Sequence, residues 1–417
     1  MKPGEHRGRG EAGEVGRRDF LRKVATGMAG VGWGGGLLEA GSVRGQEVRD
    51  REPRVEAPEG DPPKRRVIVI RFGGGVRRRE SIVPEHTWAP YLCRELTRRG
   101  TLFPRMVIDS MEGLNTSHGE GTLNLLTGRY DRYRDVADGF LKARFEPKVP
   151  TVFEYARKAA RVLPHETLII NGEDRPDEEF YTFSNHAGYG VDYRSSVLSL
   201  YRFKRWLYVH QLAQGKLTEP ERKARIDQLA KWEKSDPRSR GRDTQGPEIE
   251  AFWARWLASY GDSGRVNPRG DRLLTTLARR ALKELRPRLM MVNYNDCDYV
   301  HWGYMSHYTT GISIMDEGLR ELVETVDADP EYRDDTVFVI VPDCGRDSNP
   351  MAAVPCQHHF NSKSAHEIFA LVLGSGIRGG QVVDREVRQI DVAPTIGRWM
   401  GFRTDHAEGR VLEEAFA

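Results

Sequence analysis

An uninterrupted run of β-branched and aromatic residues from Thr336 to Val341 constrains the fold more than any other feature of the sequence. Such a run is typical of a central parallel strand that is covered on both faces. Pro342 has no N–H to donate and therefore ends the hydrogen-bond ladder of the strand. Asp343 follows at once, at the sheet edge where open α/β sheets bind their ligands. The run therefore predicts an α/β sheet with a functional carboxylate at its edge, with simple turn capping by Asp343 as the alternative.

Strand and helix patterns alternate along the rest of the chain, as an α/β fold requires. Buried strands are predicted at 67–72, 103–108, 167–171, 289–294 and 369–373, and helices at 88–99, 151–161, 272–285, 309–327 and from 390 onward. Between about 173 and 270 the pattern becomes aromatic-rich and then charged and helical, which predicts an inserted helical region that covers part of the sheet. We expect one α/β domain over 65–417, with a mostly parallel central sheet and helices on both faces.

The N-terminal region predicts export from the cytoplasm. The motif Arg-Arg-Asp-Phe-Leu begins at Arg17, and a short, Gly-rich, weakly apolar segment follows it to Leu38. This is the arrangement of a bacterial twin-arginine signal. We expect a signal peptide over 1–46, a polar, Pro-rich linker over 47–64, and a periplasmic or extracellular mature protein. An ordinary basic, disordered arm is the alternative reading.

The amino-acid composition indicates which classes of binding partner the protein is expected to lack. The formal net charge of +3 gives no global sign of nucleic-acid binding, and no stretch approaches the roughly 20 apolar residues that span a bilayer. We therefore expect no nucleic-acid partner and no integral membrane span in the mature chain; the oligomeric state stays open. Four cysteines are too few for a disulfide scaffold, although Cys344 and Cys356 are close enough in sequence to form one bridge.

Residues of the metal-ligand type recur in three segments of the chain. Asp298 and His301 stand three apart in a loop that follows a buried strand, so they can close on one divalent ion. Asp343 ends another strand, and the imidazoles of His358 and His359 follow in a loop. One crevice at the sheet edge can collect all three segments. Carboxylate and imidazole ligands together suit zinc, with manganese, iron or calcium as alternatives.

Candidate catalytic residues stand before the apolar helical run that starts near residue 119. Thr116, Ser117 and His118 precede that run, and the positive end of a helix lowers the cost of an anion or of an activated nucleophile. Arg346, three residues after Asp343, can hold an anion. Plain capping of the helix by the hydroxyl residues is the alternative.

The order of these motifs resembles the alkaline phosphatase superfamily, which includes sulfatases, phosphodiesterases and cofactor-independent phosphoglycerate mutases. The resemblance runs from about Val67 to Gly401, with the middle region unmatched. It is carried by Leu125–Tyr130 behind the family's nucleophile, the Asp298 and His301 metal pair, Asp343–Arg346 at the family's Asp-His-Gly turn, and Gly374–Ile377 followed by Ile390–Ile396 at its C-terminal signature. The resemblance implies a metal-dependent hydrolase that acts on a small anionic ester, either a phosphate or a sulfate.

The family's first metal site is kept in this sequence. It uses an Asp, a His and a late His, which Asp298, His301 and either His358 or His359 can supply.

The family's second metal site is altered. It uses an Asp at the end of the first strand, the nucleophile and the Asp-His turn. Here Arg71 and Phe72 lead into glycine instead, the nucleophile position falls on His118, and Cys344 replaces the histidine of the turn. A thiolate is a good zinc ligand, but the first-strand carboxylate has no replacement in the sequence.

Three functional hypotheses follow. The leading one is an exported, metal-binding hydrolase of a phosphate or sulfate ester, in which Ser117, Thr116 or a metal-activated water is the nucleophile. The alternative is a catalytically inactive relative that uses the metal or the fold for binding. The third is a structural protein whose histidines are buried and satisfied, which predicts no bound metal. The substrate itself is not indicated by the sequence.

Overall fold

The computed structural model describes residues 65–108, 116–130, 146–173, 178–235, 246–261, 270–301, 304–349, 356–358 and 362–417. All of these belong to one compact unit, which spans 61–417. The predicted signal peptide and linker lie outside the described residues.

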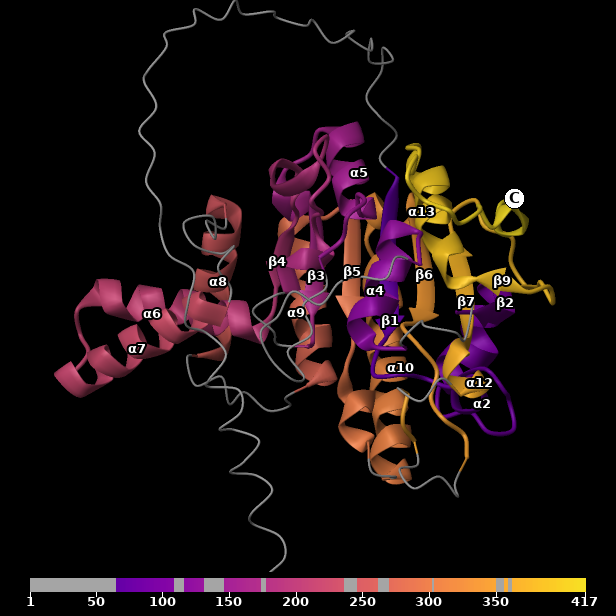
Figure 1. Ribbon diagram of the computed structural model, residues 1–417, viewed down its shortest axis with the longest axis horizontal. Coiled ribbons are helices and arrows are strands. Elements are labelled where there is room, and N and C mark those ends of the chain that lie inside the picture. The colour runs from indigo at the N-terminus through magenta and orange to yellow at the C-terminus, as the bar shows by residue number, and fades with distance from the viewer. Residues whose placement is uncertain are drawn as a thin grey trace, which may run out of the picture. The chain divides into compact units, whose positions relative to one another are not determined.

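A mixed, mostly parallel sheet forms the centre of this unit (Figure 1). Its strands within the described residues are β1 Arg66–Phe72, β2 Gly100–Val107, β3 Thr167–Asn171, β4 Ser196–Leu198, β5 Leu289–Asn293, β6 Thr336–Pro342, β7 Glu367–Gly374, β8 Gln381–Val382 and β9 Val387–Arg388. Their order is β4-β3-β5-β1-β6-β7-β2-β8, and β9 also pairs with β2. Strands β4, β3, β5, β1 and β6 are parallel, whereas β7 runs antiparallel to both β6 and β2. The expected mostly parallel sheet is confirmed.

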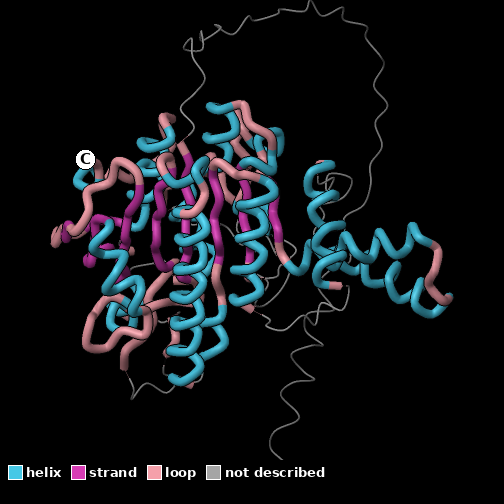
Figure 2. The backbone as a smooth tube through the Cα atoms, turned by 180° about the vertical axis from the view of Figure 1, so that it is seen from behind, coloured by secondary structure: helices cyan, strands magenta, loops and turns pink. Residues whose placement is uncertain are grey.

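Helices cover both faces of the sheet. The α-helices among the described residues are α2 Arg78–Ser81, α3 Thr97–Arg99, α4 His118–Thr127, α5 Val152–Ala160, α6 Leu200–Gln214, α7 Glu219–Ser235, α8 Pro247–Tyr260, α9 Asp271–Leu285, α10 Met305–Asp327, α11 Pro330–Arg333, α12 Lys363–His366 and α13 Val392–Met400. Successive side chains of a strand point to opposite faces, so Ile68 and Ile70 of β1 pack with α9 and α10 (Figure 2), while Val67 and Val69 pack with α4, α5 and α13.

The helical region predicted between about 173 and 270 contains α6, α7 and α8. Phe203 of α6 and Trp253 and Trp256 of α8 are buried in the same hydrophobic cluster as α9 and α10. The short edge strand β4, which pairs in parallel with β3, also lies in this range and was not predicted. It is only three residues long, too short for its alternation to be recognised in the sequence.

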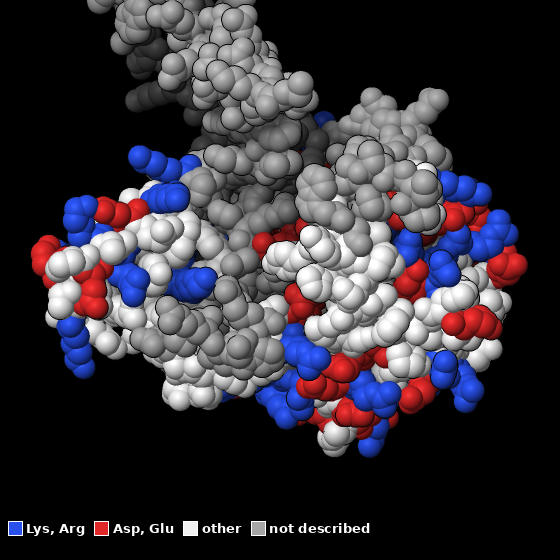
Figure 3. Space-filling view, turned by 90° about the horizontal axis from the view of Figure 1, so that it is seen from below, with Lys and Arg blue, Asp and Glu red and all other residues white. Residues whose placement is uncertain are grey.

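Among the described residues, no helix combines the length and the apolar character needed to cross a membrane. On the face seen in Figure 3, the described Lys and Arg side chains are interspersed with Asp and Glu. Many Lys and Arg side chains on the surface of the described unit form ion pairs with Asp or Glu. Arg279, for example, lies 2.6 Å from Glu321. This distribution follows from the nearly balanced charge of the chain.

The carboxyl ends of β5, β1 and β6 meet at one edge of the sheet, because these strands are adjacent and parallel. Strand β5 leads into a 3₁₀ turn, Asp296–Val300, and β6 leads into Asp343. Helix α4 begins at the same place, since Gly121 of its first turn packs against the backbone of Asp343. A side chain at Gly121 would have its Cβ 2.2 Å from the Asp343 carbonyl oxygen, so only glycine permits this approach.

Candidate metal centre

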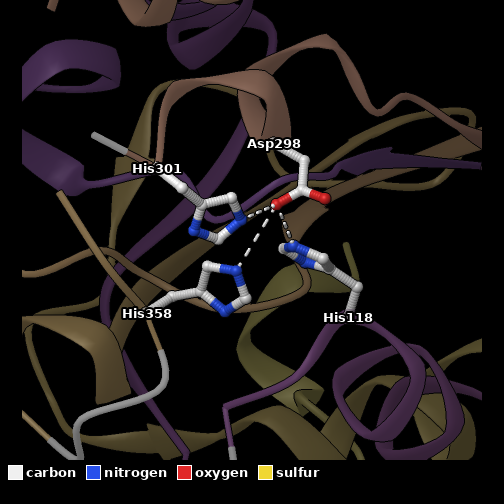
Figure 4. Close-up of side chains that lie close together, drawn as sticks. All are labelled: His118, Asp298, His301 and His358. Carbon is white, nitrogen blue, oxygen red and sulfur yellow. Dashed lines mark hydrogen bonds and ion pairs between the residues drawn. The ribbon is translucent and has the colours of Figure 1, made fainter. Parts of the chain in front are cut away.

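Three imidazoles converge on one carboxylate oxygen at this sheet edge (Figure 4). The Nε2 atoms of His301, His118 and His358 lie 2.6, 2.8 and 3.5 Å from Oδ1 of Asp298. One ligand atom from each of these four residues can be chosen so that all lie within 4.8 Å of one another. The side chains of Asp298 and His301 are 24% and 27% exposed, whereas His118 and His358 are buried. The cluster is therefore accessible from the Asp298 side.

The opposite ring nitrogen of each histidine has its own hydrogen-bond acceptor. Nδ1 of His118 lies 2.6 Å from Oδ2 of Asp343, and Nδ1 of His358 lies 2.7 Å from the carbonyl oxygen of Thr116. Nδ1 of His301 lies 2.8 Å from Oε1 of Gln357. Histidines that bind metals almost always donate their other N–H to a carboxylate or a carbonyl, which fixes the tautomer and orients the ring. All three imidazoles are thus held with Nε2 toward a common point.

The charges within the cluster stabilise one another. Burial alone would raise the pKa of Asp298, but the charge of His118 and hydrogen bonds from the imidazoles outweigh it and hold that pKa well below its usual range. Burial alone would lower the pKa of His118, but the charges of Asp343 and Asp298 outweigh it and raise that pKa. Without a metal, His118 is therefore an imidazolium between two carboxylates. A divalent cation would take the place of its Nε2 proton.

The donor set fits a transition metal. Three imidazole nitrogens and one carboxylate are the ligands of zinc sites, and manganese and iron also accept them. Calcium prefers six to eight oxygen ligands, so it fits this nitrogen-rich set less well. Of the residues predicted as ligands, Asp298, His301 and His358 meet in this cluster. His359 lies outside the described residues.

Asp343 and Cys344 lie beside this cluster rather than within it. His118, Asp343 and Cys344 form a second group whose ligand atoms can lie within 4.8 Å of one another. Sγ of Cys344 is 3.9 Å from Nδ1 of His118. Burial, together with the neighbouring charge of Asp343, raises the pKa of the Cys344 thiol to about 11. Without a metal, the thiol therefore stays protonated at neutral pH.

Arg71, at the end of β1, is a site residue to which the sequence analysis assigned no role. Its side chain is fully buried, and Nη1 lies 2.8 Å from Oε1 of Glu173 and 3.4 Å from Oδ2 of Asp343. The same guanidinium also donates to the hydroxyl of Thr122 in α4. An arginine inside an otherwise apolar strand was the sequence signal that could have indicated this role, because buried arginines are nearly always paired.

The three predicted catalytic residues at the start of α4 make different hydrogen bonds. Ser117 is the N-cap of α4: its Oγ accepts from the backbone N–H of Glu120 at 3.3 Å and lies 3.2 Å from Oε2 of the same residue. The hydroxyl of Thr116 donates to the carbonyl oxygen of His358. His118, at the position of the family's nucleophile, has both ring nitrogens directed at carboxylates.

The predicted anion-binding residue, Arg346, is fully buried. Its guanidinium donates to the carbonyl oxygens of Gly75, at 3.0 Å, and Cys297, at 2.8 Å, and also to those of Gly74 and Cys356. These bonds tie the glycine-rich loop after β1 to the turn that carries Asp298. The observed contacts of Arg346 thus fix the backbone around the cluster.

All four cysteines of the chain are described, and none forms a disulfide. The bridge considered between Cys344 and Cys356 is not formed. Sγ of Cys356 instead lies 3.2 Å from the sulfur of Met305.

Fold and cluster together define an α/β protein with the fold of the alkaline phosphatases and a histidine-rich candidate metal centre. Solved structures similar to it include a protein in the alkaline phosphatase superfamily from Vibrio parahaemolyticus, with a TM-score of 0.51 and 15% identity over 86% of this chain and 72% of that one. Alkaline phosphatase PafA has a TM-score of 0.53 and 10% identity over 85% of this chain and 99% of its own. The phosphonate monoester hydrolase of Agrobacterium radiobacter has a TM-score of 0.50 and 13% identity over 84% and 77%.

These likenesses establish the fold, and the low identities mark the chain as a divergent example of it. No family model and no curated protein matches the sequence. The resemblance inferred from the sequence motifs is confirmed at the level of the fold.

Proposed function

We propose that this chain is a metal-dependent hydrolase of phosphate or sulfate esters that works with a single divalent ion. One observation carries the proposal: the Nε2 atoms of three histidines face one oxygen of Asp298, while each Nδ1 has its own acceptor. That arrangement is characteristic of imidazoles prepared for a metal. The ester class is supported by the solved structures of similar fold, two of which are named as a phosphatase and a phosphonate monoester hydrolase.

The residues of the chain have distinct tasks in this proposal. His118, Asp298, His301 and His358 would hold the ion, which supplies a Lewis acid for the ester and lowers the pKa of a water. The ester would approach from the Asp298 and His301 side, because the other two ligands are buried. With the ion bound in place of the Nε2 proton, Asp343 would accept the remaining proton of His118 at Nδ1 and so leave the Nε2 lone pair for the ion.

Metal content of the purified chain from Glu47 onward is the first test. Elemental analysis is expected to give one equivalent in the wild type and none in His301→Ala. The matched control is His86→Ala, which removes an exposed histidine outside the cluster and should keep the ion. Wild-type protein without metal would contradict the proposal.

Activity on aryl phosphates, aryl sulfates and phosphonate monoesters is the second test. We expect turnover that chelation abolishes and that the Thr116→Ala, Ser117→Ala double variant retains, because both hydroxyls bond to neighbouring groups instead of facing the cluster. Loss of turnover in a folded, metal-loaded double variant would instead identify a hydroxyl nucleophile.

A catalytically inactive, metal-binding relative is the second candidate. The specific observation in its favour is that His118 stands where the family's nucleophile is expected and has both nitrogens engaged. One equivalent of metal without turnover on any of the three ester classes would favour this candidate.

The N-terminal region supports a further part of the proposal, export by the twin-arginine pathway. Changing Arg17 and Arg18 to lysine in the full-length chain should leave the protein in the cytoplasmic fraction of an expressing bacterium. Unchanged periplasmic recovery of the variant would contradict export by this route.

A further inference from the structure

We propose that the guanidinium of Arg71 takes the place of a second metal ion and thereby limits the centre to one ion. This inference rests on the proposed function, since it concerns how many ions the same site holds. It addresses the second group of candidate ligands, His118, Asp343 and Cys344.

The first reason to expect a single ion is the number of lone pairs that His118 can offer. A neutral imidazole offers one lone pair, on the nitrogen that carries no proton. Nε2 of His118 faces Asp298, His301 and His358 across the first cluster, and its Nδ1 lies 2.6 Å from Asp343 as a hydrogen-bond donor. Binding a second ion through Nδ1 would require the ring to lose both protons. His118 is therefore a ligand for one ion only.

The second reason is that both oxygens of the Asp343 carboxylate already have partners within the protein. Oδ1 accepts from the backbone N–H groups of Gly75, at 3.2 Å, and Cys344, at 2.9 Å. Oδ2 lies 2.6 Å from Nδ1 of His118 and 3.4 Å from Nη1 of Arg71. An ionised carboxylate has about four lone-pair positions; three of them accept hydrogen bonds here, and the Arg71 cation stands 3.4 Å from Oδ2. A metal ion at the remaining position would have to take the place of that guanidinium.

The third reason is the positive charge of Arg71, which would repel a second metal ion. Its guanidinium is fully buried, and its contacts come from Glu173, Asp343, Thr122 and backbone carbonyls. A dication beside Asp343 would stand next to this cation in a medium of low dielectric, where like charges repel strongly. Arg71 itself neutralises Asp343 and holds it against His118. It is thus a positioning residue that acts on the metal ligand His118 through Asp343.

The test counts metal equivalents by elemental analysis after loading with Zn²⁺ or Co²⁺ and removing the excess. The inference expects one equivalent in the wild type and in Cys344→Ser. The Co²⁺-loaded wild type should also lack a thiolate-to-cobalt charge-transfer band in the near ultraviolet. Arg71→Asp, which replaces the buried cation by a carboxylate, is expected to bind a second equivalent. Arg79→Asp, the same charge change at an exposed position of helix α2, should stay at one.

The outcomes separate this inference from the proposed function. Two equivalents in the wild type, falling to one in Cys344→Ser, would overturn the inference and the single-ion part of the proposed function, and would leave a metal-dependent hydrolase standing. One equivalent in a folded Arg71→Asp protein would also overturn it, because the guanidinium would then not be what excludes the second ion. No metal in the wild type would refute the proposed function and the inference with it. The wild-type count requires no variant, so the inference stays falsifiable if Arg71→Asp does not fold.

Discussion

Gln357 is placed to control the orientation of His301, the proposed ligand whose side chain is most exposed to solvent. Its Oε1 accepts from Nδ1 of His301, and its Nε2 donates to the carbonyl oxygen of the same residue, both at 2.8 Å. Two bonds from one side chain fix both the ring and the backbone of His301. Since Gln357 is itself buried, the geometry does not depend on solvent.

We therefore expect Gln357→Ala to weaken metal binding by about 10–100-fold, the usual effect of removing the partner of a metal-bound histidine. Competition with a chromophoric chelator measures this change. Gln381→Ala, in the edge strand β8, is the control and should bind as tightly as the wild type. An unchanged affinity in Gln357→Ala would show that His301 is oriented by other contacts.

Glu120, in the first turn of α4, predicts a pH dependence of stability. Burial raises its pKa from 4.5 to about 7, and a hydrogen bond with Ser117 only partly offsets this. The folded state therefore keeps a proton that the unfolded chain loses. A pKa raised on folding gives a stabilising contribution that is complete below pH 4.5 and is lost as the pH rises through 7.

Glu120→Gln lacks this titration, so its stability relative to the wild type should rise between pH 4.5 and pH 8. The difference should reach roughly 1–3 kcal/mol, because one pKa unit corresponds to about 1.4 kcal/mol and the side chain is partly exposed. Urea unfolding of the two metal-free proteins at pH 5 and pH 8 measures it. A difference that is the same at both pH values would contradict the assignment to Glu120.

Residue types alone indicated part of the cluster. Asp298 and His301 were recognisable because ligand-type residues after a strand are unusual and because their spacing suits one ion. The sequence predicted a third ligand from the following loop but left it open between His358 and His359. The roles of Arg71 and Gln357 were not recognisable. These roles depend on which groups face the two side chains across the sheet edge, and no local sequence pattern encodes such contacts. The sequence placed His118 at the position of a nucleophile, and only the fold shows that its ring meets Asp298 and Asp343.

At the scale of elements, the turn that carries Asp298 is positioned by helix α9. Asp271, the first residue of α9, accepts from the backbone N–H groups of Asn295, at 2.9 Å, and Asp296, at 2.8 Å. In return, Oδ2 of Asp296 accepts from the N–H of Asp271 at 3.1 Å. Burial and the nearby charge of Asp296 raise the pKa of Asp271. The two carboxyl groups thus join the start of α9 to the start of the turn that carries Asp298.

Removing this connection should weaken metal binding without touching a ligand. We expect Asp271→Ala to lower the affinity by about tenfold, at the lower end of the range for residues that orient ligands. Calorimetric titration with Zn²⁺ measures the change. Asp227→Ala, at an exposed position of α7, is the control. If Asp271→Ala binds as tightly as that control, the turn is held by its other contacts, such as those from Arg346.

Long, strongly patterned elements and the mostly parallel character of the sheet were predictable from the sequence, but the antiparallel direction of β7 was not. The runs at β1, β5 and β6 read as buried parallel strands because both of their faces are apolar, which is what two covering helix layers require. Strand β7 has the same character, yet it runs antiparallel to β6. Direction is set by how the chain returns to the sheet, and that depends on connections remote from the strand itself.

At the scale of the whole described unit, the helical region after β4 belongs to the same hydrophobic core as the sheet. Trp253 and Trp256 of α8 are buried together with Phe203 of α6 in the cluster that α9 and α10 share with the strands. Helix α7, by contrast, is mostly exposed, and Ile226 within it is 43% exposed. The region therefore contains one part that stabilises the fold and one part that lies on its surface.

Two alanine substitutions, one in the buried part of the region and one in the exposed part, test this division. Trp253→Ala should lower the free energy of unfolding by about 3–5 kcal/mol, because it removes a large buried ring and leaves a cavity. Ile226→Ala should change it by less than about 0.5 kcal/mol, as surface substitutions do. Urea denaturation followed by circular dichroism measures both. If α6–α8 were an independent module, Trp253→Ala would instead split the transition in two, with the sheet unfolding at the wild-type midpoint. A single, shifted transition is expected, because the rings of α8 and the strands of the sheet lose their contacts in one step.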